Sequence, residues 1–292
     1  MKGFCIGLIL FLICLLEAKC QVLTDSVLIE SHYRTFHFNK PKIKPQNYNL
    51  IFVLHGSGGD GKGIMKAAMS LEKQSGPQPI FLVYPDGYKK YWNECRKAAT
   101  SAANLENMNE QAFFEAMLRY FAHKYGINNQ RFFAIGLSGG GHMAFKLALT
   151  MPDKCKGISA FVANLPDTPN LDCIESKKPV AVMITNGTQD PINPYQGGPV
   201  VVNGSSFGSV HSTNGTFRYW AGLAGYQGEP NVENVPDKNT RNKQSITRFT
   251  YQEKNKPEIV LLEVKGGEHT FPADIDGFTE SWQFFARQIP SN

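Results

Sequence analysis

A serine flanked by glycines carries the clearest chemical potential in this sequence. Residues 136–140 read Gly-Leu-Ser-Gly-Gly, which places Ser138 in a Gly-x-Ser-x-Gly pattern. This pattern is typical of a sharp strand-to-helix turn that projects a serine hydroxyl, because larger neighbours would clash there. An apolar run at 131–135 precedes it and an apolar helical stripe follows it, as the pattern requires. We therefore predict that Ser138 is a catalytic nucleophile.

A serine hydroxyl is a weak nucleophile, so it needs a base that is itself held by a third group. In strand-turn-helix sites of this kind, the acid and then the histidine follow the serine in the chain. Asp190 follows the apolar run 179–185, and His269 follows the run 259–264. Both should emerge at the sheet edge where Ser138 lies. We predict Asp190 as the supporting acid and His269 as the base.

Other residues of the same types are placed less well along the chain. His142 lies inside the helix that follows the serine, and His211 follows no predicted strand. Asp167 and Asp172 precede the run 179–185 and would stand at the wrong end of that strand. These positions favour His269 and Asp190 over them.

A tetrahedral intermediate also needs preorganised hydrogen-bond donors for its oxyanion. The backbone N–H of Gly139 is one candidate, since it opens the helix after the serine. The second should come from the glycine-rich loop at 55–59. We choose the N–H of Ser57, with Gly58 as the alternative, and expect His55 to shape this loop without taking part in catalysis.

The elements that position these residues alternate between strands and helices. Short apolar runs of this kind are typical of strands covered on both faces; they lie at 48–54, 80–84, 131–135, 179–185 and 259–264. Apolar stripes with helical spacing lie at 110–125, after Ser138, and near 278–285. This alternation predicts an α/β fold with a mostly parallel central sheet and helices on both faces.

Two segments depart from that alternation. Residues 24–38 alternate in short stretches and predict an antiparallel hairpin at the edge of the sheet. Residues 191–256 are rich in Gly, Asn, Ser and Pro, with a short helix candidate at 216–223. We expect them to form a loop-rich insertion or cap over the carboxyl edge of the sheet.

Taken together, these motifs resemble the polyhydroxybutyrate depolymerase/feruloyl esterase family of α/β-hydrolases, which overlaps the first carbohydrate esterase family. The likeness runs from about Asn49 to the C-terminus and includes the loops 54–60, 84–87 with 92–93, 136–140, 187–191 and 266–272. It implies a secreted serine hydrolase of carboxylic esters that needs no metal or cofactor. It also implies that Trp92 is an aromatic wall beside the acyl pocket.

The resemblance leaves the substrate open. Feruloyl or acetyl esters of plant polysaccharide are the first expectation, and short polyesters such as poly(3-hydroxybutyrate) are the alternative. A serine peptidase or an acyltransferase could use the same three residues, and a secreted binding protein could keep a dead hydrolase scaffold. The filled set of Ser138, Asp190 and His269 argues against the binding protein.

The first residues predict export. Lys2 and the apolar run 4–16 are typical of a signal peptide, and the run is too short to span a bilayer. We expect a signal peptide at 1–20, a catalytic domain at 21–292, and a secreted or periplasmic protein. Lipid attachment at Cys20 is an alternative, which Lys19 disfavours because that position is normally small.

Charge and cysteine content narrow the possible partners. The net charge of +5 is small and spread along the chain, which argues against a nucleic-acid ligand. Export leaves Cys95, Cys155 and Cys173 in an oxidising compartment. We expect Cys155 and Cys173 to pair, with the pairings of Cys95 as alternatives. No two of these cysteines have the spacing of zinc ligands.

Overall fold

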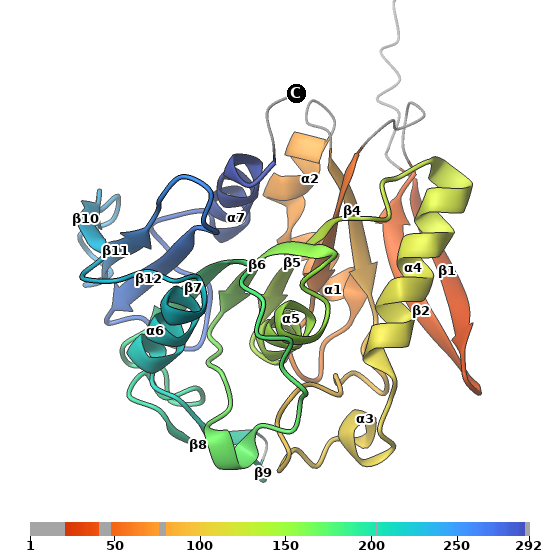
Figure 1. The fold of residues 1–292 in the computed structure, drawn as a ribbon, viewed down its shortest axis with the longest axis horizontal. Helices are drawn as coiled ribbons and strands as arrows, with labels where there is room; N and C mark the ends of the chain where they lie inside the picture. Colours follow the sequence, from red (N-terminus) through yellow and green to blue (C-terminus); the bar gives the residue numbers. More distant parts are fainter. Residues whose placement is uncertain (1–20, 41–47, 76–79, 203, 290–292) are drawn as a thin grey trace, which may run out of the picture.

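The computed structural model describes residues 21–40, 48–75, 80–202 and 204–289. The described residues build a ten-stranded sheet in the order β1-β2-β4-β3-β5-β6-β7-β12-β11-β10 (Figure 1). Its middle strands all run parallel; they are β4 (Ile80–Pro85), β3 (Asn49–Leu54), β5 (Phe132–Leu137), β6 (Cys155–Phe161), β7 (Ala181–Gly187) and β12 (Ile259–Lys265). The predicted α/β fold with a mostly parallel sheet is confirmed.

Antiparallel pairs close both edges of this sheet. At one edge β1 (Val22–Ile29) pairs with β2 (His32–Asn39), as the alternation in residues 24–38 predicts. At the other edge β10 (Asn231–Val235) and β11 (Ser245–Tyr251) pair in the same manner next to β12. The parallel strands are therefore covered at their sides, while their carboxyl ends share one edge.

Helices cover both faces of the sheet. One face packs against α4 (Glu110–Tyr125), α5 (Gly139–Thr150) and α6 (Thr213–Leu223), which lie in front of the sheet in Figure 1. The other face packs against α1 (Gly61–Ala67), α2 (Met69–Ser75) and α7 (Gly277–Arg287). Because neighbouring side chains of a strand point to opposite faces, residues 50, 52 and 54 of β3 enter the first core and residues 51 and 53 the second.

Burial on both faces explains why the strands read as unbroken apolar runs. All six residues of β3 and all six of β4 are buried.

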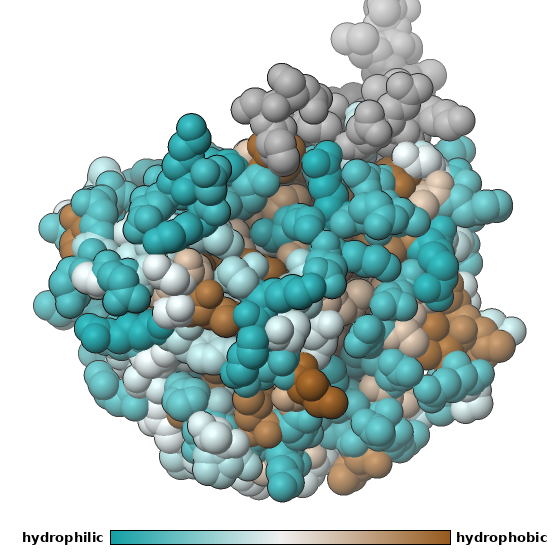
Figure 2. Space-filling view, viewed as in Figure 1, coloured by the Kyte–Doolittle hydropathy of each residue, from teal (hydrophilic) through white to brown (hydrophobic). Residues whose placement is uncertain are grey.

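The view in Figure 2 is mainly hydrophilic, with hydrophobic residues in small separate areas, since the apolar helix stripes face inward.

The sequence did not predict strand β6. Its residues include Lys156 and Ser159, which interrupt the apolar run that marks the other parallel strands. Ser159 is fully buried, and its hydroxyl accepts a hydrogen bond of 2.8 Å from the Ser281 hydroxyl on α7. A hydrogen bond between β6 and α7 thus replaces apolar packing at this position, and no local sequence pattern signals it.

The expected loop-rich insertion at 191–256 contains more regular structure than its composition suggests. It holds the hairpin of β8 (Gly198–Val202) and β9 (Ser205–Val210), helix α6, and strands β10 and β11. The last two strands extend the main sheet, so only the first part of the segment lies over the carboxyl edge. Two short helices, α3 (Ala102–Leu105) and η1 (Thr168–Asn170), lie in loops at that same edge (Figure 1).

The predicted signal peptide at 1–20 lies outside the described residues. Within the described residues, no helix combines the length and apolar character needed to cross a membrane.

Candidate active site

Ser138 stands at the turn between β5 and α5 with a backbone that few residues adopt. Its φ is 52° and its ψ is −116°, an unfavourable region for a residue with a side chain. The flanking glycines are required by space: a Cβ on Gly136 would lie 2.0 Å from the carbonyl oxygen of Gly140. A Cβ on Gly140 would lie 2.3 Å from the carbonyl oxygen of Leu54 on β3. The sharp turn therefore lifts the Ser138 hydroxyl out of the strand.

The structure brings Ser138, His269 and Asp190 together in one hydrogen-bonded chain. The Nε2 atom of His269 lies 2.8 Å from the Oγ of Ser138, and its Nδ1 lies 2.7 Å from an Oδ of Asp190. Asp190 follows β7 and His269 follows β12, two adjacent parallel strands. The carboxylate accepts from Nδ1–H, so Nε2 is left to accept the serine proton.

The Asp190 carboxylate is held by the turn that it begins. Its side chain is fully buried, and its second oxygen accepts the N–H groups of Ile192 and Asn193, each at 2.8 Å. An aspartate that accepts backbone N–H groups two and three residues on is typical of turns. The sequence analysis did not predict these donors, although the Asp190-Pro191 pair was a signal for such a turn.

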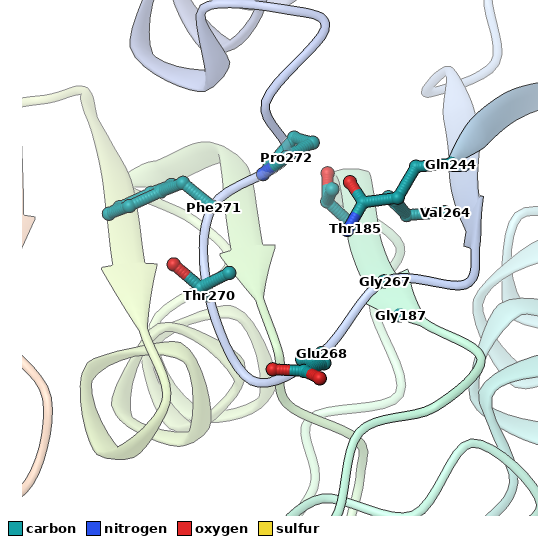
Figure 3. Close-up of a pocket in the computed structure, with 9 residues that line it drawn as sticks. All are labelled: Thr185, Gly187, Gln244, Val264, Gly267, Glu268, Thr270, Phe271 and Pro272. Atoms are coloured by element: carbon teal, nitrogen blue, oxygen red, sulfur yellow. The ribbon is translucent and has the colours of Figure 1, made fainter. Parts of the chain in front are cut away.

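The loops that carry the acid and the base are packed against each other. A Cβ on Gly187 would lie 2.2 Å from the carbonyl oxygen of Gly267, and that oxygen accepts the Gln189 N–H at 2.9 Å. Figure 3 shows the loop after β12 curving around a small pocket, with Thr270 and Phe271 on one side and Thr185, Gln244 and Val264 on the other. That pocket is lined by Thr185, Gly187, Gln244, Val264, Gly267, Glu268, Thr270, Phe271 and Pro272. This lining includes none of Ser138, Asp190 and His269.

The glycine-rich loop after β3 lies beside the start of α5. A Cβ on Gly139 would lie 3.0 Å from the amide nitrogen of Ser57, so the two backbones are in contact. The N–H of Gly58 donates to the carbonyl oxygen of Lys90 at 2.9 Å and is therefore occupied. The Ser57 N–H has no hydrogen-bond partner among the described residues. Of the two alternatives for the second oxyanion donor, this geometry favours Ser57.

His55 and Trp92 lie beneath that loop and hold it. The Nδ1 of His55 donates to the carbonyl oxygen of Gly56, and its Nε2 accepts the Gly87 N–H. Burial lowers the pKa of His55, which fits this neutral pairing. The Trp92 indole N–H donates to the carbonyl oxygen of His55 at 2.9 Å, and the two rings pack 4.9 Å apart.

The structure corrects the expectation that Trp92 forms an aromatic wall beside the acyl pocket. Only 2% of this residue is exposed, because its ring packs into the core beside Phe114 and His55. It leaves almost no surface for a substrate, so its contact with the His55 loop is structural.

The competing histidines and aspartates lie elsewhere. His142 is buried in α5 one turn after Ser138, and its pKa is lowered well below the usual value, mainly by burial. His211 follows β9, and its N–H donates to the carbonyl oxygen of Leu165. Asp167 caps η1 by accepting the Asn170 N–H, and Asp172 lies beside the disulfide. Neither aspartate makes a hydrogen bond to His269 in the described part of the chain.

The disulfide joins Cys95 to Cys173, so the expected Cys155–Cys173 pair is wrong. Cys155 is the first residue of β6, is fully buried and carries a free thiol. Cys95 and Cys173 lie on loops after β4 and β6, and their Cα atoms are 5.1 Å apart. The bond ties together two loops at the carboxyl edge.

Among the described residues, no group of three or more His, Cys, Asp or Glu side chains is placed to hold a metal.

The chain matches a known family and several known proteins. The model of the phospholipase/carboxylesterase family matches residues 39–203, which include Ser138 and Asp190. Feruloyl esterase C of Emericella nidulans is 26% identical over 161 residues, covering 53% of this chain and 54% of that protein. A probable feruloyl esterase C of Aspergillus oryzae is 25% identical over 200 residues, covering 65% and 66%. The chain thus spans about half to two thirds of the length of these curated relatives.

Solved structures show the same fold at low sequence identity. The acetyl xylan esterase from Aspergillus awamori aligns with a TM-score of 0.58 at 16% identity, over 90% of this chain and 99% of that one. The ferulic acid esterase of the anaerobic fungus Anaeromyces mucronatus aligns with a TM-score of 0.55 at 14% identity, over 91% and 90%. These likenesses and the family match confirm the predicted α/β-hydrolase fold.

Proposed function

Because this chain belongs to the phospholipase/carboxylesterase family, we propose that it is a serine esterase that hydrolyses carboxylic esters through Ser138, His269 and Asp190. The observation that carries this proposal is the hydrogen-bonded chain from Ser138 through His269 to Asp190. In that order a serine, a histidine and an aspartate form the constellation that performs acyl transfer on many folds.

The first half of the reaction forms an acyl-enzyme. The Ser138 oxygen attacks the ester carbonyl carbon while His269 Nε2 takes the hydroxyl proton. The Asp190 carboxylate stabilises the resulting imidazolium and keeps the ring oriented. The N–H groups of Gly139 and Ser57 donate to the oxyanion. The tetrahedral intermediate then breaks its bond to the alcohol oxygen, which leaves with the proton that His269 returns.

The second half restores the enzyme. A water molecule gives its proton to His269 and attacks the acyl carbon, which forms a second tetrahedral intermediate at the same oxyanion site. The bond from the acyl carbon to Ser138 breaks, and the serine oxygen regains its proton from His269. The carboxylic acid is released, so one ester and one water give one acid and one alcohol.

The proposed substrates are feruloyl or acetyl esters of plant polysaccharide. Two kinds of likeness support this choice: the curated relatives are named feruloyl esterases, and the loops at 54–60 and 266–272 resemble those of the feruloyl esterase family. Hydrolysis of short polyesters, cleavage of peptides and acyl transfer to an alcohol acceptor are the competing reactions. Hydroxybutyrate oligomers test the first, and assays of peptide cleavage and of acyl transfer test the other two.

We also propose that the protein is exported. The apolar run at 4–16 supports a signal peptide. The Cys95–Cys173 disulfide gives independent support, because disulfides persist in oxidising compartments.

The test is hydrolysis of methyl ferulate, acetylated xylan, hydroxybutyrate oligomers and p-nitrophenyl acetate by the wild type and by Ser138→Ala. We expect wild-type activity on at least one ester and a loss of about 10⁴-fold or more in the variant. An inactive wild type, or a variant that matches it, would overturn the esterase proposal. The ranking of the esters names the acyl group.

A further inference from the structure

A small apolar cluster lies apart from the two main cores, at the carboxyl edge of the sheet. We call it the edge cluster. Its buried members are Ala99, Val200, Phe207 and Val210, and the half-buried Tyr91, Ile192 and Val202 pack against them. The three half-buried side chains expose apolar surface to water, which favours binding of another apolar group there.

The edge cluster is built by the loop after β4 and by the chain that follows β7. Tyr91 and Ala99 belong to the first, while Ile192 and the β8–β9 hairpin belong to the second. On β8, Val200 and Val202 point into the cluster, whereas Val201 between them is 52% exposed. This alternation gives the hairpin an apolar inner face and a solvent face.

Asn170, from the loop after β6, holds these parts together. Its carbonyl oxygen accepts the Lys97 N–H and its Oδ1 accepts the Ala98 N–H. Its Nδ2 donates to the carbonyl oxygens of Phe207 and Ser209 on β9. A residue that is only 6% exposed thus links the loop after β4 to the hairpin through four hydrogen bonds, and so fixes the shape of the cluster.

Two members of the edge cluster are joined directly to the catalytic loops. The N–H of Ile192 donates to the Asp190 carboxylate at 2.8 Å. Tyr91 follows Lys90, whose carbonyl oxygen accepts the N–H of Gly58 in the oxyanion loop. The cluster is therefore connected to both the acid loop and the proposed oxyanion loop, on the same sheet edge as Ser138.

The charge beside the edge cluster is already paired. The Arg96 guanidinium stacks on Phe207 at 4.6 Å, and it donates to the Glu94 carboxylate at 2.7 and 2.9 Å. Both side chains are 2% exposed. Because the guanidinium is paired with Glu94 and buried, it adds no charge to the surface that Tyr91, Ile192 and Val202 present.

We propose that Tyr91, Ile192 and Val202 form a specificity wall that binds a bulky apolar group of the ester, an aryl group or an alkyl chain of several carbons. This inference rests on the proposed esterase function and names the substrate class of the same site. The apolar group can belong to the acid or to the alcohol, and the chemistry of binding is the same for both.

Two substrate series separate these sources. The first comprises methyl acetate, butyrate and hexanoate, which lengthen the acid; the second comprises methyl, butyl and hexyl acetate, which lengthen the alcohol. Burial of one methylene group is worth about a fourfold change in binding. Burial of three of the added methylene groups against the wall would raise kcat/KM about 60-fold along one series for the wild type, and that series identifies the group in contact with the wall.

Variants on separate segments test the wall, and each has a matched control. In Ile192→Ala and Tyr91→Ala the rise should shrink to about fivefold or less. Ile192→Ala keeps the backbone N–H that binds Asp190. The controls Ile174→Ala and Val201→Ala replace side chains that are 91% and 52% exposed, and both should retain the full rise.

The inference is overturned if neither series shows a rise while wild-type p-nitrophenyl acetate is still hydrolysed. It is also overturned if both wall variants keep the rise, or if the controls lose it equally. Failure of the esterase function itself looks different, because p-nitrophenyl acetate would then not be hydrolysed and a fluorophosphonate would not label Ser138.

Discussion

Gly139 and Ser57 approach so closely that a Cβ on Gly139 would press against both the side chain and the backbone of Ser57. A Cβ at this position would lie 2.5 Å from the Ser57 hydroxyl oxygen and 3.0 Å from its amide nitrogen. Helix α5 and the loop after β3 thus set the spacing of the two proposed oxyanion donors. In the proposed mechanism these N–H groups are in place before the substrate binds, so the site needs no rearrangement as negative charge develops.

We predict that Gly139→Ala lowers kcat by about 10²- to 10³-fold, because the displaced Ser57 N–H no longer reaches the oxyanion. The KM should change little, since these donors act mainly in the transition state. Steady-state kinetics on p-nitrophenyl acetate measure both parameters.

Gly222→Ala is the matched control. A Cβ on this residue of α6 would meet nothing within 4 Å, and alanine favours helices, so activity should be unchanged. Equal activity of Gly139→Ala and wild type would contradict the assignment of this contact to the oxyanion site.

The sequence predicted the residues that follow buried strands better than it predicted side-chain neighbours. Ser138, Asp190 and His269 each stand beyond an apolar run, and parallel topology brings those ends to one edge. The Cys95–Cys173 pair was only an alternative to the expected Cys155–Cys173 pair, because its contact depends on the paths of two long loops. Trp92 was misplaced for a related reason: the loop after β4 turns its ring inward to bind the carbonyl oxygen of His55.

Removal of the disulfide should destabilise the protein. The Cys95–Cys173 bond closes a loop with a sequence separation of 78 residues, for which chain entropy gives about 4 kcal/mol. We expect the double variant Cys95→Ser/Cys173→Ser to lose about that much free energy of unfolding in urea titrations.

A reductant provides the control for this prediction. Dithiothreitol should lower the stability of the wild type and leave the double variant unchanged. Equal unfolding free energies for the oxidised wild type and the double variant would argue against the disulfide's contribution.

Buried His142 predicts a loss of stability in acid. Burial, and then the charge of Arg96, lowers its pKa well below the usual value of 6.5. Below pH 6.5 the unfolded chain binds a proton that the folded protein does not, so stability falls as the pH falls. The slope from this group is about 1.4 kcal/mol per pH unit, measurable by urea unfolding between pH 8 and pH 5.

His142→Gln should flatten that pH dependence, whatever it costs at pH 8, because glutamine does not titrate. The exposed His123 on α4 gives the comparison: His123→Gln should keep the wild-type slope. A His142→Gln variant with the wild-type slope would show that other groups cause the acid sensitivity.

Asp190→Asn should reduce kcat by about 10⁴-fold while the protein stays folded, because an amide no longer holds His269 in the productive tautomer. The control is Asp153→Asn, whose side chain is 79% exposed and pairs only with Lys178 in the described structure. A fall in kcat of less than tenfold in Asp190→Asn would contradict the assignment of Asp190 as the supporting acid.

Covalent labelling tests the central claim most directly, because it asks whether Ser138 is an activated nucleophile without requiring the natural substrate. The wild type is treated with a fluorophosphonate, and the modified peptide is identified by mass spectrometry. We predict one adduct at Ser138, no adduct in Ser138→Ala, and labelling at least about 10³-fold slower in His269→Ala. Labelling of another serine, or equal labelling of Ser138→Ala, would contradict the assignment of Ser138 as the nucleophile.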